Sequence, residues 1–152
     1  GFEEQIDNEK YEYKPRDFAA ARGNGIEDLL TRLNAARAAH PALRQLRDIW
    51  FHPTSDDALI AYSKRVDAAH SPTGEDDVVL TVVNLDPHSA REGEVYLNLV
   101  QLGLPGDTDG SLPCLRVADE LTGAEFEWSG TNYVRLDPFA GHVAHVLHVE
   151  PL

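Results

Sequence analysis

The amino-acid sequence is poor in sulfur and in positive charge. Its 152 residues include one cysteine and no methionine, and 13 lysines and arginines stand against 26 aspartates and glutamates, a net charge of −13. A single cysteine cannot form a disulfide within the chain. The basic residues are scattered among acidic ones, so the positive surface that nucleic acids and anionic membranes require is missing. We therefore expect neither nucleic acid nor membrane as a partner.

Long apolar runs are missing as well. The sequence has no run of 18 apolar residues and no basic segment followed by an apolar one. It therefore predicts no membrane span and no secretory signal, and the simplest compartment is the cytoplasm. Because the chain starts at Gly1 and contains no methionine, we expect it to begin inside a longer protein.

The apolar residues that are present suffice for one core of ordinary size, since they make up 42% of the chain. Residues 1–16 follow neither the helical nor the strand period and are predicted to form a loop. Residues 24–40 carry apolar side chains at helical spacing, which predicts an amphipathic helix. Pro41 should end that helix and open a second, short helical piece over residues 42–46.

After Asp48 the pattern changes to short apolar runs bounded by Pro, Gly, Asp and Asn, which is typical of an all-β domain. The sequence therefore predicts an antiparallel β-sandwich. We expect its strands at Ile49–His52, Leu59–Lys64, Val78–Leu85, Glu94–Val100, Leu115–Ala118, Glu125–Trp128, Tyr133–Leu136 and His142–Val149. We expect its core to contain Val79, Leu80, Val82, Val95, Leu97, Phe126 and Val146.

The helical part and the β-part are expected to be different domains, residues 1–48 and 49–152, with the boundary near Arg47 and Asp48. The apolar stripe of the predicted helix needs a surface to cover it. A small sandwich offers only its edge or its outer face. Part of the stripe is therefore expected to lie against a body outside this chain.

Several motifs resemble those of glycoside hydrolase family 13. Residues 30–43, which end in His-Pro-Ala-Leu, resemble the last barrel helix of that family, and residues 58–65, 78–84 and 136–139 follow in the order of its C-terminal β-sandwich. Within the family the chain most resembles the GlgE-type maltosyltransferases, and this resemblance covers nearly the whole chain. The motifs that carry it are Glu9-Lys10-Tyr11, Arg16-Asp17-Phe18, Asn98-Leu99-Val100, Leu121-Thr122-Gly123 and Gly130-Thr131-Asn132-Tyr133-Val134.

The resemblance implies both a fold and an activity. Residues 1–48 would be the end of a (β/α)8 catalytic barrel, namely the loop after strand 8 and the last helix, and residues 49–152 an α-amylase-type C-terminal β-sandwich. The parent enzyme would transfer maltosyl units from α-maltose 1-phosphate to α-1,4-glucan by a retaining mechanism, without a cofactor. The implied partners are the barrel of the same protein, the donor and the glucan. The resemblance also allows for a homodimeric parent.

The resemblance places the three catalytic acids on earlier barrel strands, outside this chain. A retaining transfer requires two carboxyl groups about 5–5.5 Å apart on rigid elements. Glu125 and Glu127 are the tempting pair, but they alternate with Phe126 and Trp128 and are predicted to form the solvated side of a hairpin. We assign no catalytic residue to the chain and expect it to be inactive alone.

Lys10 and Tyr11 are the candidate substrate-binding residues. The resemblance implies that this pair follows barrel strand 8 and contacts the maltosyl unit at its non-reducing end. A lysine offers three donors for sugar hydroxyls, and a tyrosine offers a ring face and one hydroxyl. The alternative is a basic residue and a ring that pack on a loop.

The histidines and the cysteine receive structural interpretations. On one strand, His145 would point away from His142 and His148, which would lie about 20 Å apart, so we expect no metal site there. His40, before a proline, is expected in a cap region or an interface. Cys114 is predicted to be a small buried hydrophobic residue.

Two other functions remain open. A free-standing carbohydrate-binding module would need an exposed stacking platform, for which Trp50, Tyr96, Trp128 and Tyr133 are the candidates. The chain could also be the C-terminal domain of another family 13 α-glucan hydrolase, because leaving-group recognition lies mostly upstream. A purely structural domain that seals the barrel would differ from the leading hypothesis only in the role of the lysine–tyrosine pair.

Overall fold

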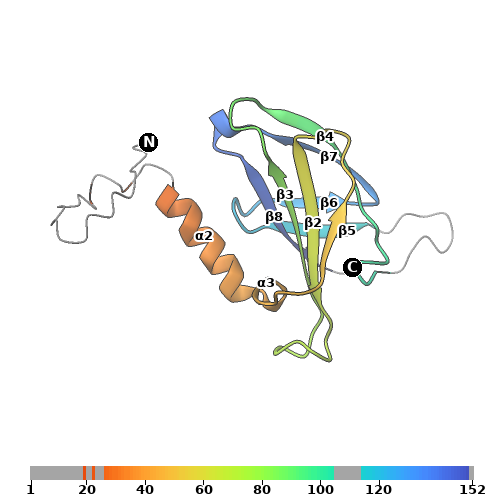
Figure 1. Ribbon diagram of the computed structural model, residues 1–152. Helices are drawn as coiled ribbons and strands as arrows, with labels where there is room; N and C mark the ends of the chain where they lie inside the picture. The colour runs from red at the N-terminus through yellow and green to blue at the C-terminus, as the bar shows by residue number, and fades with distance from the viewer. Residues whose placement is uncertain (1–18, 20–21, 23–25, 105–113, 151–152) are drawn as a thin grey trace.

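The computed structural model describes residues 19, 22, 26–104 and 114–150. Within them, two helices, α2 (Ile26–Ala39) and α3 (Pro41–Arg44), precede eight strands. Figure 1 shows both helices to one side of the strands. The strands are β1 (Ile49–His52), β2 (Leu59–Val66), β3 (Asp77–Asn84), β4 (Arg91–Tyr96), β5 (Leu115–Asp119), β6 (Glu125–Trp128), β7 (Thr131–Leu136) and β8 (Ala144–Glu150), with a 3-10 helix, η1 (Pro138–Ala140), before β8.

The strands form two antiparallel sheets. One sheet has six strands in the order β1-β2-β3-β8-β5-β6, and the other pairs β4 with β7. All strand pairs among the described residues are antiparallel. One apolar cluster joins residues of both sheets, which is the arrangement of a β-sandwich. The fold class predicted for the β-part of the sequence is therefore confirmed.

The interior of the sandwich is built from side chains that are fully buried. Leu80, Val117 and Leu147 come from the large sheet, Val95 and Leu136 come from the small one, and all five are 0% exposed. Alternation along each strand places these residues on the inner face. At about 1.5–3 kcal/mol for each fully buried aliphatic side chain, this cluster is a large contribution to the stability of the fold.

A second, smaller cluster lies between the helices and the large sheet. Ala36 of α2 packs there with Val79 of β3, Val146 of β8 and Leu121 of the β5–β6 turn. Val79 alternates with Leu80, so β3 is apolar on both faces because it has the sandwich core on one side and the helices on the other. β3 accordingly lies inside the six-stranded sheet, between β2 and β8.

Two predictions about buried residues were wrong. Phe126 is 37% exposed, because β6 is an edge strand with a neighbour on one side only. Cys114 is exposed, immediately before β5. The other six residues of the predicted core are buried.

The predicted strands are found with small shifts at their ends, the largest in β4. This strand covers residues 91–96, whereas residues 94–100 were expected. Leu97 is buried as predicted, and Leu99 is buried as well, but both lie in the segment that follows the strand and closes over the core. In the described parts of the chain, no helix is long and apolar enough to cross a membrane.

Replacing Leu80 with alanine tests the inner core. Leu80 is 0% exposed, so Leu80→Ala should lower the free energy of unfolding by about 2–5 kcal/mol. Leu46 is 99% exposed, and Leu46→Ala should change it by less than about 0.5 kcal/mol. Chemical denaturation followed by circular dichroism measures both, and equal effects would contradict the assignment of the core.

Candidate functional site

Lys10 and Tyr11, the residues predicted to bind substrate, lie outside the described residues. Their role stays a prediction. Among the described residues, the polar side chains that bear on the predicted function lie where the helices meet the sandwich.

His40 lies at the centre of this junction and is 7% exposed. It is the N-cap of α3 and has an extended backbone, since the following Pro41 disfavours helical geometry. Its Nδ1 lies 3.0 Å from Oδ1 of Asp77, the first residue of β3. Its Nε2 lies 3.1 Å from Oε1 of Glu120. The cap or interface position expected for His40 is confirmed.

Asp77 holds the helix as well as the histidine. The first amides of a helix have no partner within it, and the His40 side chain does not cap α3. Oδ2 of Asp77 instead accepts a hydrogen bond of 2.8 Å from the amide of Ala42. One buried carboxylate of the sheet therefore fixes both the helix start and the ring before it.

His148 of β8 completes the cluster. Its ring centroid is 4.5 Å from that of His40, and its Nε2 lies 3.6 Å from Oδ1 of Asp77. Burial lowers the pKa of His148, and the neighbouring His40 lowers it further, while Asp77, Glu120 and Glu150 act in the opposite direction. The net effect favours the neutral ring, whose nitrogen keeps a free electron pair.

The β5–β6 turn provides a second attachment for α2. The side chain of Leu121 packs against Ala36, and its carbonyl accepts a hydrogen bond from the guanidinium of Arg32. Asp119, which is 1% exposed, fixes this turn by accepting from the amides of Leu121 (3.1 Å) and Val146 (3.2 Å). The motif Leu121-Thr122-Gly123 thus supports the helix.

His145 and Thr122 also contact the Asp119 carboxylate. His145 Nδ1 lies 2.9 Å from Oδ2, and the Thr122 hydroxyl donates to the same oxygen at 2.8 Å. Burial alone would raise the pKa of Asp119, but the hydrogen bonds from His145 and the other donors outweigh it and lower the pKa. The folded protein therefore favours the ionised form of Asp119 over the protonated form more strongly than water does.

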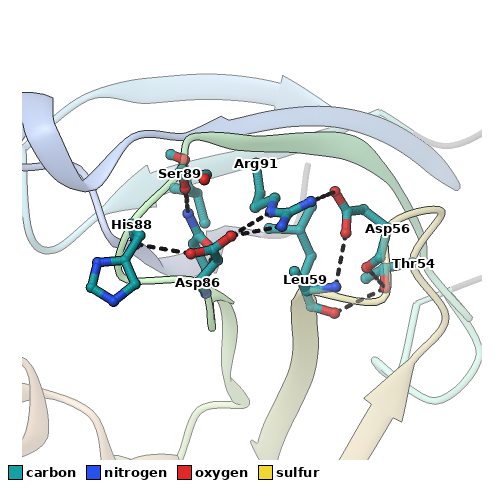
Figure 2. Close-up of polar contacts among 10 residues, drawn as sticks. Thr54, Asp56, Leu59, Asp86, His88, Ser89 and Arg91 are labelled. Atoms are coloured by element: carbon teal, nitrogen blue, oxygen red, sulfur yellow. Dashed lines mark hydrogen bonds and ion pairs between the residues drawn. The ribbon is translucent and has the colours of Figure 1, made fainter.

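A third polar network holds the β3–β4 loop (Figure 2). Asp86 accepts hydrogen bonds from the amide of His88 (2.8 Å) and from Nε and Nη2 of Arg91 (3.0 and 2.6 Å). The His88 amide and the Arg91 guanidinium lower the pKa of Asp86. Asn84, at the end of β3, donates to the last carbonyl of β7 at 3.1 Å. These contacts join the two sheets, so we assign Asn84 and Asp86 a structural role.

The aromatic residues do not form the platform that a free-standing carbohydrate-binding module would need. Trp128 is 6% exposed and belongs to the core. Trp50 and Tyr96 are 46% and 38% exposed and line one hollow of about 650 Å³. Tyr133 is 63% exposed and lines another hollow, of about 520 Å³. These four residues therefore do not form the single platform that this alternative requires.

The acidic pair and the strand histidines lie as the alternation predicted. Glu125 and Glu127 are exposed on the edge strand β6, and we assign them no catalytic role. His145 faces Asp119 and His148 faces His40, on opposite sides of β8. His142 precedes β8 and is exposed.

The sequence missed that His40, Asp77 and His148 come together. The strand pattern relates His148 only to the histidines of its own strand. The neighbours of His148 in space depend on the pairing of β3 with β8 and on the position of α3. Neither of these can be recognised from residues close to His148 in the sequence. The one local signal was His40 before Pro41, which marks a helix boundary.

The fold is that of an antiparallel β-sandwich preceded by two helices, the arrangement expected of a C-terminal domain attached to a barrel. A family model described as "GLGE, C-terminal" matches residues 51–149. The chain belongs to this family.

Three curated relatives are alpha-1,4-glucan:maltose-1-phosphate maltosyltransferases. The protein of Arcanobacterium haemolyticum is 45% identical over 100% of this chain and 22% of its own length, and that of Bifidobacterium longum is 47% identical over 99% and 19%. The second enzyme of Streptomyces coelicolor is 51% identical over 98% and 20%. The chain spans about a fifth of the length of these relatives.

The Asp119 carboxylate should contribute stability that depends on pH. Its pKa in the folded protein is below the unfolded value, so the contribution is present above the unfolded pKa and is lost as the pH falls through the folded pKa. At neutral pH, Asp119→Asn should lower the free energy of unfolding by about 1–3 kcal/mol. This difference in the free energy of unfolding between the wild type and Asp119→Asn, called the gap below, should become smaller as the pH falls from about 5 toward about 2.

Denaturation at several pH values measures the gap, with Glu125→Gln as the control. Glu125 is an exposed acid, and its loss should change the free energy of unfolding by less than about 0.5 kcal/mol. A gap for Asp119→Asn that stays constant down to acid pH would contradict the role assigned to the carboxylate.

Proposed function

We propose that this chain is the C-terminal part of an enzyme that transfers maltosyl units from α-maltose 1-phosphate to α-1,4-glucan by a retaining mechanism. One observation carries the proposal: the family match over residues 51–149 is accompanied by relatives with 45–51% identity that all bear the name of this transferase. Those relatives are about five times as long as the chain. The catalytic acids are assigned to the part that precedes it.

In this proposal residues 1–48 are the end of the catalytic barrel and residues 49–152 are the C-terminal domain. The exposure of α2 supports this division. Ile26 and Leu30 are 71% and 53% exposed, whereas Ala36, nearer the sheet, is buried. The apolar stripe of α2 extends beyond the sandwich, so its exposed residues need another surface to pack against. We assign that surface to the barrel.

The role of the sandwich is then to hold the last barrel helix in place. Asp77 fixes the start of α3, and Leu121 with Arg32 fixes the side of α2. A retaining transfer requires two carboxyl groups about 5–5.5 Å apart, held by rigid elements. Support of the outer helices contributes to that rigidity.

Lys10 and Tyr11 are proposed to bind the maltosyl unit of the donor. The similarity to the Arcanobacterium haemolyticum protein covers 100% of this chain, so it includes the segment that carries the pair. The donors of the lysine and the ring of the tyrosine suit a sugar.

We further propose that the enzyme acts in the cytoplasm, needs no cofactor and forms a homodimer. A single cysteine suits a reducing compartment. A retaining transfer proceeds through carboxyl groups of the protein itself. The free-standing carbohydrate-binding module is less well supported because Trp128 is buried, and the names of the relatives favour a transferase over a hydrolase.

Lys10→Ala in the full-length enzyme tests the donor site. A hydrogen bond from a charged donor is worth about 1.5–3 kcal/mol, so kcat/KM for α-maltose 1-phosphate should fall about ten- to hundredfold. Tyr11→Phe should have a smaller effect because it removes one neutral hydroxyl. Lys14→Ala, four residues further along, is the matched control and should leave kcat/KM within about twofold.

The melting temperature of each variant shows whether folding is retained. A well-folded Lys10→Ala enzyme with unchanged donor kinetics would remove Lys10 from the donor site. A lower melting temperature with normal kinetics would mean that Lys10 packs rather than binds.

The chain of 152 residues, produced alone, should release no phosphate from α-maltose 1-phosphate in the presence of glycogen. The physical reason is that a positioned nucleophile and a positioned acid supply most of the acceleration in such reactions. Phosphate release is the measurement. Release above a no-protein control that persists through repurification would contradict the assignment of the catalytic acids to the preceding part.

A further inference from the structure

Three potential metal ligands meet where α3 joins the sheet. His40, Asp77 and His148 each offer one ligand atom within 4.8 Å of the other two. Oδ1 of Asp77 lies 3.0 Å from Nδ1 of His40 and 3.6 Å from Nε2 of His148. Ligand atoms at zinc distances around a tetrahedral ion lie about 3.4 Å apart. The two distances to Asp77 are within a few tenths of an ångström of that value, and the distance between the two imidazole nitrogens is at most 4.8 Å.

Carboxylate oxygens lie close to both ring nitrogens of His40. Its two ring nitrogens lie 3.0 Å from a carboxylate oxygen of Asp77 and 3.1 Å from one of Glu120, and a neutral imidazole has only one N–H. With that hydrogen on Nδ1, facing Asp77, Nε2 is buried and makes no hydrogen bond. The contact with Glu120 is close but lacks the direction of a hydrogen bond.

A metal ion on Nδ1 removes this conflict. The ion would take the electron pair of Nδ1 and leave the hydrogen on Nε2, which lies 3.1 Å from Oε1 of Glu120. Histidine ligands commonly donate their second N–H to a carboxylate, which fixes the ring and strengthens the ligand. Glu120 is close enough to become that partner once its side chain rotates into line with the ring N–H.

Charge and access also suit a cation. Asp77 lies close to both imidazoles and Glu120 lies close to His40, so two carboxylates stand beside the two rings. The carboxylate of Asp77 is buried, and a buried charge is costly unless it is paired. The side chain of His148 is 31% exposed, which gives an ion a path from solvent.

We propose that His40, Asp77 and His148 form a binding site for a divalent transition-metal ion of the zinc type. Two imidazoles and one carboxylate select Zn²⁺ or Co²⁺ over Mg²⁺ and Ca²⁺, which prefer oxygen ligands. The ion links the segment between α2 and α3 to two strands of the large sheet. Its role is to stabilise this junction, and it takes no part in glycosyl transfer.

The experiment uses the full-length enzyme after removal of any affinity tag and treatment with a chelator. Calorimetric titration with Zn²⁺ alone measures the affinity, and the melting temperature with and without Zn²⁺ measures the effect on stability. We compare the wild type with His148→Ala, which removes a ligand but keeps the contacts of Asp77 with His40 and Ala42. The matched control is His142→Ala, since His142 is exposed and lies outside the cluster.

The wild type and His142→Ala should bind one Zn²⁺ that His148→Ala binds about 100-fold or more weakly. Glu120→Gln should weaken binding about tenfold. Co²⁺ should give the visible absorption of a tetrahedral site in the wild type and in His142→Ala, and this absorption should be absent in His148→Ala. Zn²⁺ should raise the melting temperature of the first two proteins only.

Equal Zn²⁺ affinity in the wild type and in His148→Ala would overturn the proposal. A wild type whose melting temperature does not respond to saturating Zn²⁺, or responds equally to Mg²⁺, would also overturn it. These measurements need no donor or acceptor, so their outcome is independent of the transferase activity proposed above.

Discussion

The junction between helices and sandwich depends on one buried carboxylate. Asp77 is 6% exposed and uses Oδ2 for the amide of Ala42 and Oδ1 for the ring of His40. A carboxylate in such a place is stable only with its partners, and the loss of one partner leaves a buried charge that costs about 3–5 kcal/mol. Because Asp77 starts β3, which pairs with β2 and β8, the helix start is tied to the middle of the large sheet. The sheet and the short helix therefore keep a fixed relation.

The large sheet is covered on both faces only where the helices reach it. Val79 and Val146 are buried beneath Ala36 and Leu121, so β3 and β8 are apolar on both sides. The edges of the sheet lack this cover. Phe51 of β1 is 57% exposed, although its strand pairs fully with β2. The pattern of burial follows the position of α2 more closely than the hydrophobicity of each strand.

Local signals in the sequence were enough for the strands and insufficient for the junction. Alternation of apolar residues and the turn residues between them located β1 and β6 at the residues where they lie, because both signals are contained within each segment. The predicted burial of Phe126 was wrong, because the order of the strands in the sheet makes β6 an edge strand. His40 and His148 are in contact although they lie more than 100 residues apart in the sequence, so no local pattern predicts this contact. Lys10 and Tyr11 rest on resemblance alone.

The sandwich covers only part of the apolar face of α2. An isolated helix of about 12–15 residues is marginal in water, and most helices in proteins depend on the packing of an apolar face. α2 has 14 residues, and Ala36 is the residue of α2 that is buried. Ala36, the partly buried Leu29 and the hydrogen bond from Arg32 to a carbonyl do not cover a stripe that also includes Ile26 and Leu30. The first turns of α2 therefore require a further packing surface. This requirement arises from burial alone, and it agrees with the length of the relatives, of which the chain is about a fifth.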